Sequence, residues 1–311
     1  MTDIPHILEE VIPADRISRD EPMSAHTTMR VGGAADVFVR IASAGELGEA
    51  IRLLRSAGEA YVVVGRGSNL IVSDRGYRGT VLCTSGSFAG ISCRESEDGK
   101  VYLKADAGTL LGALASYACE RELTGLEFAA GIPGTVGGAV RMNAGAYGSE
   151  TADLVASVSL LSPDGSLTAT DAAGMDFAYR HSRVSESGEI VTDCTFVMTR
   201  GDRQAIIARM EELAKARRDK QPLEYPSSGS TWKRPEGHFA AKLLEEAGCK
   251  GLRVGDAQIS EKHSGFIINR GSATASDILK LMRMAEDRVF EASGVRLTPE
   301  VEFIGMEGDD R

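Results

Sequence analysis

Cysteine is scarce in this sequence and forms no recognisable site. The five residues are odd in number and widely spaced, with no Cys-x-x-Cys pair and no Cys/His ligand spacing. A disulfide framework or a zinc site needs such spacing, so we expect reduced thiols. The first thirty residues are charged and contain no apolar core, which predicts that no secretory signal is present. Both observations predict a cytoplasmic protein.

Long hydrophobic runs and a basic excess are also missing. The least charged stretch, residues 128–140, is short and is interrupted by Gly131, Pro133 and Gly134, so no membrane span is expected. The chain has 35 Lys and Arg against 45 Asp and Glu, a net charge of −10. This balance argues against a general affinity for nucleic acid or for an anionic membrane surface. An anionic ligand would therefore have to be held by a local site.

Several common catalytic motifs are absent. The Rossmann fingerprint fails because Leu70 stands where the third glycine would follow Gly65 and Gly67. The Gly-Lys pair of a phosphate-binding Walker loop occurs once, and Val101 follows it in place of Ser or Thr. No Gly-x-Ser-x-Gly elbow and no His-Glu-x-x-His pattern is present, which disfavours a serine hydrolase or a zincin. The histidines lack metal-ligand spacing, so no metal site is predicted.

Glycine, by contrast, is in excess. The sequence has 35 glycines in 311 residues, where an ordinary composition of this length has about 22. The excess predicts many positions where the backbone turns sharply or closely approaches a ligand. The length allows two or three domains with buried cores.

The pattern of apolar residues predicts a mixed α+β protein. Residues 29–41 end in the alternation of a strand, and Ser43 with Glu46 starts a helix that Gly58 ends. Residues 61–64 then form a buried strand. Further strands are predicted at 80–84, 101–105, 265–269 and 301–304, with short strands over 155–200, and further helices at 109–122, 202–219, 240–247 and 277–292.

Two glycine-rich segments are candidate binding loops. Residues 65–69 directly follow a strand, so their backbone N–H groups could converge on a phosphate; a plain loop between two strands explains the same residues. Residues 125–148 contain too many glycines for a stable regular element and are too apolar for a solvated linker. Their backbone could lie against a flat or anionic cofactor, or the segment could be a packing loop.

Isolated polar residues offer further candidates. Arg180 could hold a carboxylate by a bidentate pair. Ser230 lies in a turn of small residues beside Lys233, and Glu300 starts a short apolar strand. Taken one at a time, Arg180 is better explained as a surface arginine and Ser230 as a turn serine, and Glu300 can be explained as a solvated strand end.

Taken together and in order, seven segments resemble the UDP-N-acetylenolpyruvoylglucosamine reductase family. They are TTMRVGG from residue 27, VVGRGSNLIVSD from 63, GLEFAAGIPGTVGGAVRMNAGAYG from 125, YRHSR from 179, GSTWKRP from 229, HSGFIIN from 263 and TPEVEFIG from 298. The short distance from Arg180 to Ser230 is similar to the family's compact type, which lacks an inserted loop whose tyrosine closes over the substrate.

The resemblance implies a fold and a division of the chain. The fold would be α+β, with a two-subdomain FAD-binding fold of the vanillyl-alcohol-oxidase type and a C-terminal α+β substrate-binding domain. Residues 1–27 would be a leader, 28–200 the FAD-binding domain with subdomains of about 28–85 and 86–200, and 201–311 the substrate-binding domain.

The resemblance also implies an activity and its ligands. NADPH as co-substrate would reduce non-covalently bound FAD, and flavin N5 would pass the hydride to UDP-N-acetylglucosamine enolpyruvate, giving UDP-N-acetylmuramate for peptidoglycan. Both substrates would use one pocket in turn. No nucleic acid or membrane partner is implied, and the oligomeric state is left open, a monomer included.

Site residues follow from the resemblance by motif position. Ser230 would donate the proton, while Arg180 and Glu300 would stabilise the charge that develops on the substrate carboxylate. Lys220 and Lys233 are candidates for the uridine diphosphate. FAD would be held by Gly65, Arg66, Gly67, Ser68, Asn69, Gly131, Ile132, Pro133, Gly134, Thr135, Gly137, Gly138, Asn143 and Gly145.

One departure and two alternatives accompany this interpretation. The family commonly has an aromatic residue, lysine, asparagine and proline after the serine motif, whereas Trp232 and Lys233 are followed here by Arg234. Any contact made by that asparagine is therefore in question. A flavin oxidase of the same fold would act on another hydroxylated substrate, and a nucleotide-binding regulatory protein would keep the fold without turnover.

Overall fold

The predicted strand, helix and strand at the start of the chain all form. They are β2 (Ala34–Arg40), α2 (Ala44–Ser56) and β3 (Tyr61–Val64). The Ser43 hydroxyl accepts the Glu46 backbone N–H at 3.1 Å, and Gly58 follows the helix with φ +68°. Arg16 donates to the Glu46 carboxylate at 2.9 and 2.7 Å. Burial opposes ionisation of Glu46, but the hydrogen bonds from Arg16 and the Ala42 backbone outweigh it and lower the pKa of this carboxyl.

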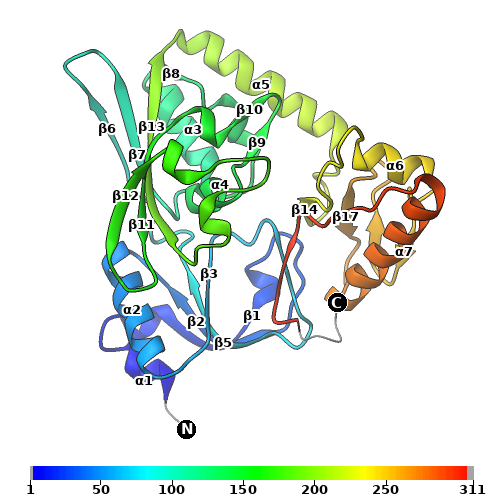
Figure 1. Ribbon diagram of the computed structural model, residues 1–311, viewed down its shortest axis with the longest axis horizontal. Helices are drawn as coiled ribbons and strands as arrows, with labels where there is room; N and C mark the ends of the chain where they lie inside the picture. Colours follow the sequence, from blue (N-terminus) through cyan, green and yellow to red (C-terminus); the bar gives the residue numbers. More distant parts are fainter. Residues whose placement is uncertain (1–2, 307–311) are drawn as a thin grey trace. The chain divides into compact units, whose positions relative to one another are not determined.

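The computed structural model describes residues 3–306 (Figure 1). It contains two compact units, each with its own apolar core. The first unit comprises residues 3–19, 37–66 and 79–216; the second comprises residues 20–36, 67–78 and 217–306. The chain passes between the units five times, at 19/20, 36/37, 66/67, 78/79 and 216/217. The predicted boundaries at residues 27 and 200 divide the chain according to the ligand that each domain would bind. The two units are defined by packing instead, so those boundaries remain a prediction.

The first unit is built around an antiparallel sheet in the order β12-β11-β13-β7-β6. Strand β13 (Ile190–Arg200) pairs with β7 from Asp193↔Asp106 to Met198↔Val101. Apolar side chains alternate along β13, and Cys194 and Phe196 are buried in the core with Leu103 of β7. The other elements here are α1 (Ile4–Leu8), β6 (Ile91–Glu95), β7 (Val101–Asp106), α3 (Leu111–Glu120), β8 (Leu123–Thr124), α4 (Val136–Arg141), β9 (Gly145–Ala146), β10 (Ser149–Glu150), β11 (Val155–Leu161) and β12 (Leu167–Asp171).

A smaller sheet has the order β1-β2-β5-β3, with β1 at Ile17–Pro22 and β5 at Tyr77–Cys83. Its β3 and β5 are parallel, in register from Tyr61↔Thr80 to Val64↔Cys83. Helix α5 (Arg203–Lys220) carries the chain from the first unit to the second. Its buried residues are Ile206 and Leu213.

The second unit has its own antiparallel sheet, β14-β17-β16-β15, and a parallel pair, β4 with β18. Helix α7 packs its buried residues Ile278, Leu281 and Met282 into the same apolar cluster as Ile267 of the sheet. The bounds are β4 (Leu70–Val72), β14 (Ser227–Ser230), α6 (Ala240–Glu246), β15 (Arg253–Val254), β16 (Ala257–Ile259), β17 (Phe266–Asn269), α7 (Ala275–Ser293) and β18 (Glu302–Ile304).

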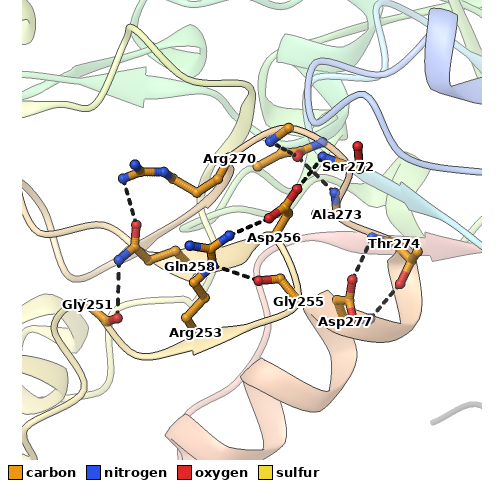
Figure 2. A network of polar contacts seen from close by, with 12 residues as sticks. Gly251, Arg253, Gly255, Asp256, Gln258, Arg270, Ser272, Ala273, Thr274 and Asp277 are labelled. Carbon is orange, nitrogen blue, oxygen red and sulfur yellow. Dashed lines mark hydrogen bonds and ion pairs between the residues drawn. The ribbon is translucent and has the colours of Figure 1, made fainter.

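Polar contacts fix the β15–β16 hairpin beside the start of α7 (Figure 2). Thr274 and Asp277 cap the helix reciprocally, at 3.0 and 3.1 Å. Asp256 accepts the Ser272 backbone N–H at 2.8 Å and is ion-paired with Arg253, and these two contacts lower the pKa of its carboxyl. The edge of the sheet opposite β14 is therefore held by side chains as well as by the strand ladder.

The glycine-rich segment 125–148 is more regular than predicted. It contains the 3₁₀ turn Glu127–Gly131, helix α4 and strand β9, which pairs with β10 directly after the segment. The expectation that its glycines prevent a regular element is wrong, because Thr135 caps α4 by accepting the Gly138 N–H at 3.4 Å. Glycine also permits close packing, since a Cβ on Gly137 would lie 3.0 Å from the Ala107 Cβ.

Candidate active site

Ser230 and Glu300 are held next to each other within the second unit. Ser230 ends β14 opposite Phe266, after a register shift that follows Ser227. The backbone N–H of Glu300 donates to the carbonyl of Thr231, the residue after Ser230, at 2.8 Å. The register shift between Ser227 and Ser230 is of the type made by a β-bulge, which changes the direction of a side chain at the end of a strand. The chain segments carrying a hydroxyl and a carboxyl thus meet from positions about seventy residues apart in sequence.

Asn69 joins the same cluster. Its side-chain amide donates to the Glu300 carbonyl at 2.9 Å, and its own carbonyl accepts the Glu302 N–H at 2.8 Å. The parallel pairing of β4 with β18, from Leu70↔Glu302, continues this contact. Of the predicted site residues, the second unit therefore brings Asn69, Ser230 and Glu300 together.

Trp232 is anchored behind this cluster. Its indole N–H donates to the Glu286 carboxylate of α7 at 2.8 Å, and its backbone forms a bridge with Pro299. Burial raises the pKa of Glu286, and the hydrogen bond from Trp232 offsets only part of that rise. The serine turn is thus tied both to the segment before Glu300 and to helix α7.

Replacing Glu286 by Gln is expected to stabilise the protein at neutral pH and not at low pH. A carboxyl whose pKa is raised on folding costs no stability below its unfolded pKa, but the cost develops as pH rises through the folded pKa. Gln does not ionise and still accepts from Trp232. We expect the melting temperature of Glu286→Gln to exceed that of the parent by about 2 °C at pH 7.5 and to match it at pH 4. The exposed Glu291→Gln on the same helix serves as control, and an advantage that did not grow with pH would contradict the prediction.

Arg180 lies in the first unit, in a tight turn. Its φ is +54°, in the left-handed region, and Ala178 and His181 exchange both backbone hydrogen bonds at 3.1 Å around it. The guanidinium donates to the Gly145 carbonyl at 3.4 Å and lies 5.0 Å from the centre of the Tyr179 ring. Arg180 is half-buried, so its cation is fixed without being removed from solvent.

The predicted phosphate loop offers donors suited to a pyrophosphate. Within residues 3–306, the backbone N–H groups of residues 65–68 donate to no acceptor. In the first unit, a Cβ on Gly65 would lie 2.4 Å from Thr135 Oγ1; in the second, a Cβ on Gly67 would lie 2.1 Å from the His26 carbonyl oxygen. Side chains are therefore excluded at both glycines, and the amides have no acceptor within the protein, a property of anion-binding backbone segments. These residues fit the diphosphate of FAD.

The remaining predicted residues are less constrained. Within the described chain, the ammonium groups of Lys220 and Lys233 form no hydrogen bond or ion pair, so both can meet an anionic ligand. The backbone of Lys233 lies near that of Glu300, because the Lys233 N–H donates to the Thr298 carbonyl at 2.8 Å.

Over residues 3–306, no group of His, Cys, Asp or Glu is arranged to hold a metal ion. None of the helices in that part of the chain combines the length and apolarity needed to cross a membrane.

Comparison with known proteins defines the class. The family model described as "FAD binding domain" matches residues 35–171, and the one described as "UDP-N-acetylenolpyruvoylglucosamine reductase, C-terminal domain" matches residues 221–304. A structure of alkyldihydroxyacetonephosphate synthase is similar in fold alone, with a TM-score of 0.50 at 15% identity over 64% of this chain and 41% of that one. The protein is thus a flavin-dependent oxidoreductase with an FAD-binding fold and a second, C-terminal domain, which confirms the predicted fold class.

Close relatives then give the family. The UDP-N-acetylenolpyruvoylglucosamine reductase of Lachnoclostridium phytofermentans is 44% identical over 298 residues, 96% of each chain, and that of Clostridium novyi is 43% identical over 99% of this chain and 98% of its own. The crystal structure of the Thermus caldophilus enzyme has a TM-score of 0.76 at 36% identity, over 93% of this chain and 98% of that one. The chain belongs to the UDP-N-acetylenolpyruvoylglucosamine reductase family.

Some residues that build the site are not apparent from sequence. Asp74 ends the VVGRGSNLIVSD segment, and its carboxylate accepts the backbone N–H groups of Ala275 and Ser276 at 2.7 and 2.9 Å, which anchors the first turn of α7. Glu286 has no local signal either. The only local signal for Asp74 is its place at the end of a glycine-rich motif, and that place does not indicate a partner two hundred residues away in sequence.

Proposed function

We propose that the protein reduces UDP-N-acetylglucosamine enolpyruvate to UDP-N-acetylmuramate, with NADPH as the reductant and FAD as the carrier of the hydride. Family membership supports the reaction, and the amides of residues 65–68 support a diphosphate-bearing cofactor. The product serves peptidoglycan synthesis. Reduced thiols fit a cytoplasmic setting: all five cysteines are free, and four of them are buried.

The observation that carries the residue assignment is the hydrogen bond between the Glu300 N–H and the Thr231 carbonyl. It supports a site in which the hydroxyl of Ser230 and the carboxyl of Glu300 face one substrate. FAD, when bound, supplies the hydride that converts the terminal CH₂ of the enolpyruvyl group to CH₃. Ser230 would give the proton to the adjacent carbon, so that the double bond is reduced by one hydride and one proton.

Charge stabilisation falls to two other residues. As the hydride arrives, negative charge develops on the substrate carboxylate, and a fixed donor aimed at that charge lowers the barrier. Arg180, whose turn holds it in a single backbone conformation, would pair with the carboxylate, and Glu300 would contribute a hydrogen bond. Lys233 and Lys220 would meet the diphosphate of the uridine nucleotide.

The cofactor would be held mainly by backbone. Gly65 to Asn69 would bind the pyrophosphate, and the segment from Gly131 to Gly138 would line the flavin with little side-chain bulk. FAD would be bound without a covalent link, as the resemblance to the family implies. Gly145 extends the same segment.

An anaerobic absorbance experiment tests the proposed reaction. The purified holoenzyme should lose its flavin bands on addition of NADPH and recover the oxidised spectrum on addition of UDP-N-acetylglucosamine enolpyruvate, at one substrate per flavin. Recovery with oxygen and not with the enolpyruvyl sugar would favour an oxidase of the same fold. A protein that takes up FAD but is not bleached by NADPH would favour a regulatory role and overturn the proposal.

A further inference from the structure

Asn143 is a fully buried polar residue whose side-chain amide is bonded to protein at both ends. It is 0% exposed and has a left-handed backbone, with φ +41°. Its amide nitrogen donates to the Ala178 carbonyl at 3.2 Å, and its amide oxygen accepts the Ala152 N–H at 3.0 Å. The residue therefore joins two segments that are distant in sequence.

The Ala178 carbonyl belongs to the turn that carries Arg180. That oxygen also accepts the His181 N–H, so it receives two hydrogen bonds, one from within the turn and one from Asn143. A left-handed conformation is unfavourable for a side chain such as arginine and persists only where surrounding contacts impose it. The Asn143 amide is one of those contacts.

Other bonds from the same segment reinforce the turn on its far side. The Arg141 carbonyl accepts the hydroxyls of Ser182 and Ser185 at 2.8 and 3.2 Å, and the Arg141 guanidinium donates to the Val184 carbonyl at 2.8 Å. The Arg180 guanidinium itself donates to Gly145. Residues 141–145 thus hold the backbone before and after Arg180 and also meet its side chain.

We propose that Asn143 is a positioning residue for Arg180: its amide fixes the 178–181 turn in the left-handed conformation that presents the guanidinium to the substrate carboxylate. The inference rests on the proposed role of Arg180. It gives Asn143 a function distinct from contact with FAD, since its side chain is fully buried and its amide nitrogen and oxygen are hydrogen-bonded within the protein, to Ala178 and Ala152.

Asn143→Asp tests the hydrogen bond from the Asn143 amide to the Ala178 carbonyl with almost no change in the shape of the side chain. Aspartate tolerates the left-handed backbone and still accepts from Ala152, but in its ionised form it cannot donate to Ala178 and places a second acceptor beside that carbonyl. We expect the variant to retain FAD, while reoxidation of its reduced flavin by substrate slows about 10- to 100-fold, as expected for a misplaced catalytic group. Hydrogen exchange in a peptide spanning 178–182 should rise at least tenfold. Asp20→Asn, an Asn/Asp exchange at an exposed left-handed residue, should change neither by more than about twofold.

A double-mutant cycle with Arg180→Ala separates positioning from general support of the fold. If Asn143 acts through Arg180, adding Asn143→Asp to Arg180→Ala should slow reoxidation by less than about twofold further. An equal slowing in both backgrounds, or loss of FAD from Asn143→Asp, would overturn the inference while leaving the proposed function intact. An Arg180→Ala variant with an unchanged rate would instead overturn the proposed role of Arg180, and the inference with it. Should Asn143→Asp not fold, Asn143→Gly keeps the left-handed backbone and removes the same donor.

Discussion

Ser230→Ala is expected to leave reduction of the bound flavin by NADPH within about twofold of the parent rate and to slow reoxidation by the enolpyruvyl sugar about 10³-fold. The two half-reactions differ in what they need from the protein. Flavin reduction needs no proton at the substrate carbon, whereas the second half-reaction does, and Ser230 is the hydroxyl that the second unit holds beside Glu300. Anaerobic stopped-flow absorbance measures both rates on one preparation.

Ser227→Ala is the matched control for this experiment. Ser227 starts the same strand, and within the described residues its hydroxyl forms no hydrogen bond, so its loss should alter neither rate by more than about twofold. Slowing of both half-reactions by Ser230→Ala would indicate a change in the flavin site. An unchanged second half-reaction would remove Ser230 as the proton donor.

Gly67→Ala is expected to lower the free energy of unfolding by about 3 kcal/mol or more and to yield protein without FAD. Gly67 has φ +65°, and a Cβ there would lie 2.1 Å from the His26 carbonyl oxygen and 2.9 Å from the Thr27 Cα. Both neighbours are backbone atoms, and the Thr28 N–H donates to the Gly67 carbonyl at 3.2 Å. This bond ties the two segments together, so neither can easily move away from the new methyl group. The new methyl group must therefore displace the loop whose amides we assign to the pyrophosphate.

Gly248→Ala isolates the effect of the backbone angle. Gly248 has φ +66°, nearly that of Gly67, but a Cβ on Gly248 would have no neighbouring atom within 4 Å. Its substitution should cost about 1 kcal/mol, the penalty of a left-handed alanine, and leave flavin content unchanged. Urea denaturation and the flavin-to-protein absorbance ratio give both quantities, and equal losses in the two variants would contradict the assignment of Gly67 to a crowded cofactor loop.

Local rules predicted the capped helices well. The Ser43 cap of α2 is present as predicted, and α7 begins two residues earlier than predicted because Thr274 and Asp277 cap it, then ends at Gly294 with φ +72°. Helix α4 escaped prediction because glycine has a low helix propensity, while its stabilising contacts, the Thr135 cap and the close approach of Gly137 to Ala107, depend on tertiary packing.

The residue types of the site and the order of its motifs could be predicted from the sequence. The hydrogen bonds between these residues could not. Asn69 contacts Glu300 across 231 positions of sequence, and such a contact leaves no periodic or local signal. The roles of Asn143 and Glu286 are likewise set by partners on other elements. Motif resemblance supplied the residues that meet ligands, whereas the residues that orient them became visible only in three dimensions.

The repeated passage of the chain between its two units has a consequence for synthesis. Residues 20–36 emerge early, but most of the second unit begins at residue 217, so roughly 180 residues separate them from their partners. At a translation rate of about 5–20 residues per second, the early segment waits roughly 10 to 40 seconds before the first of these partners is synthesised. Met29 and Val31, buried in the finished core, are exposed on the nascent chain for that interval. A chain released after residue 216 would leave these apolar side chains without their cover, which makes truncated products natural substrates for chaperones and proteases.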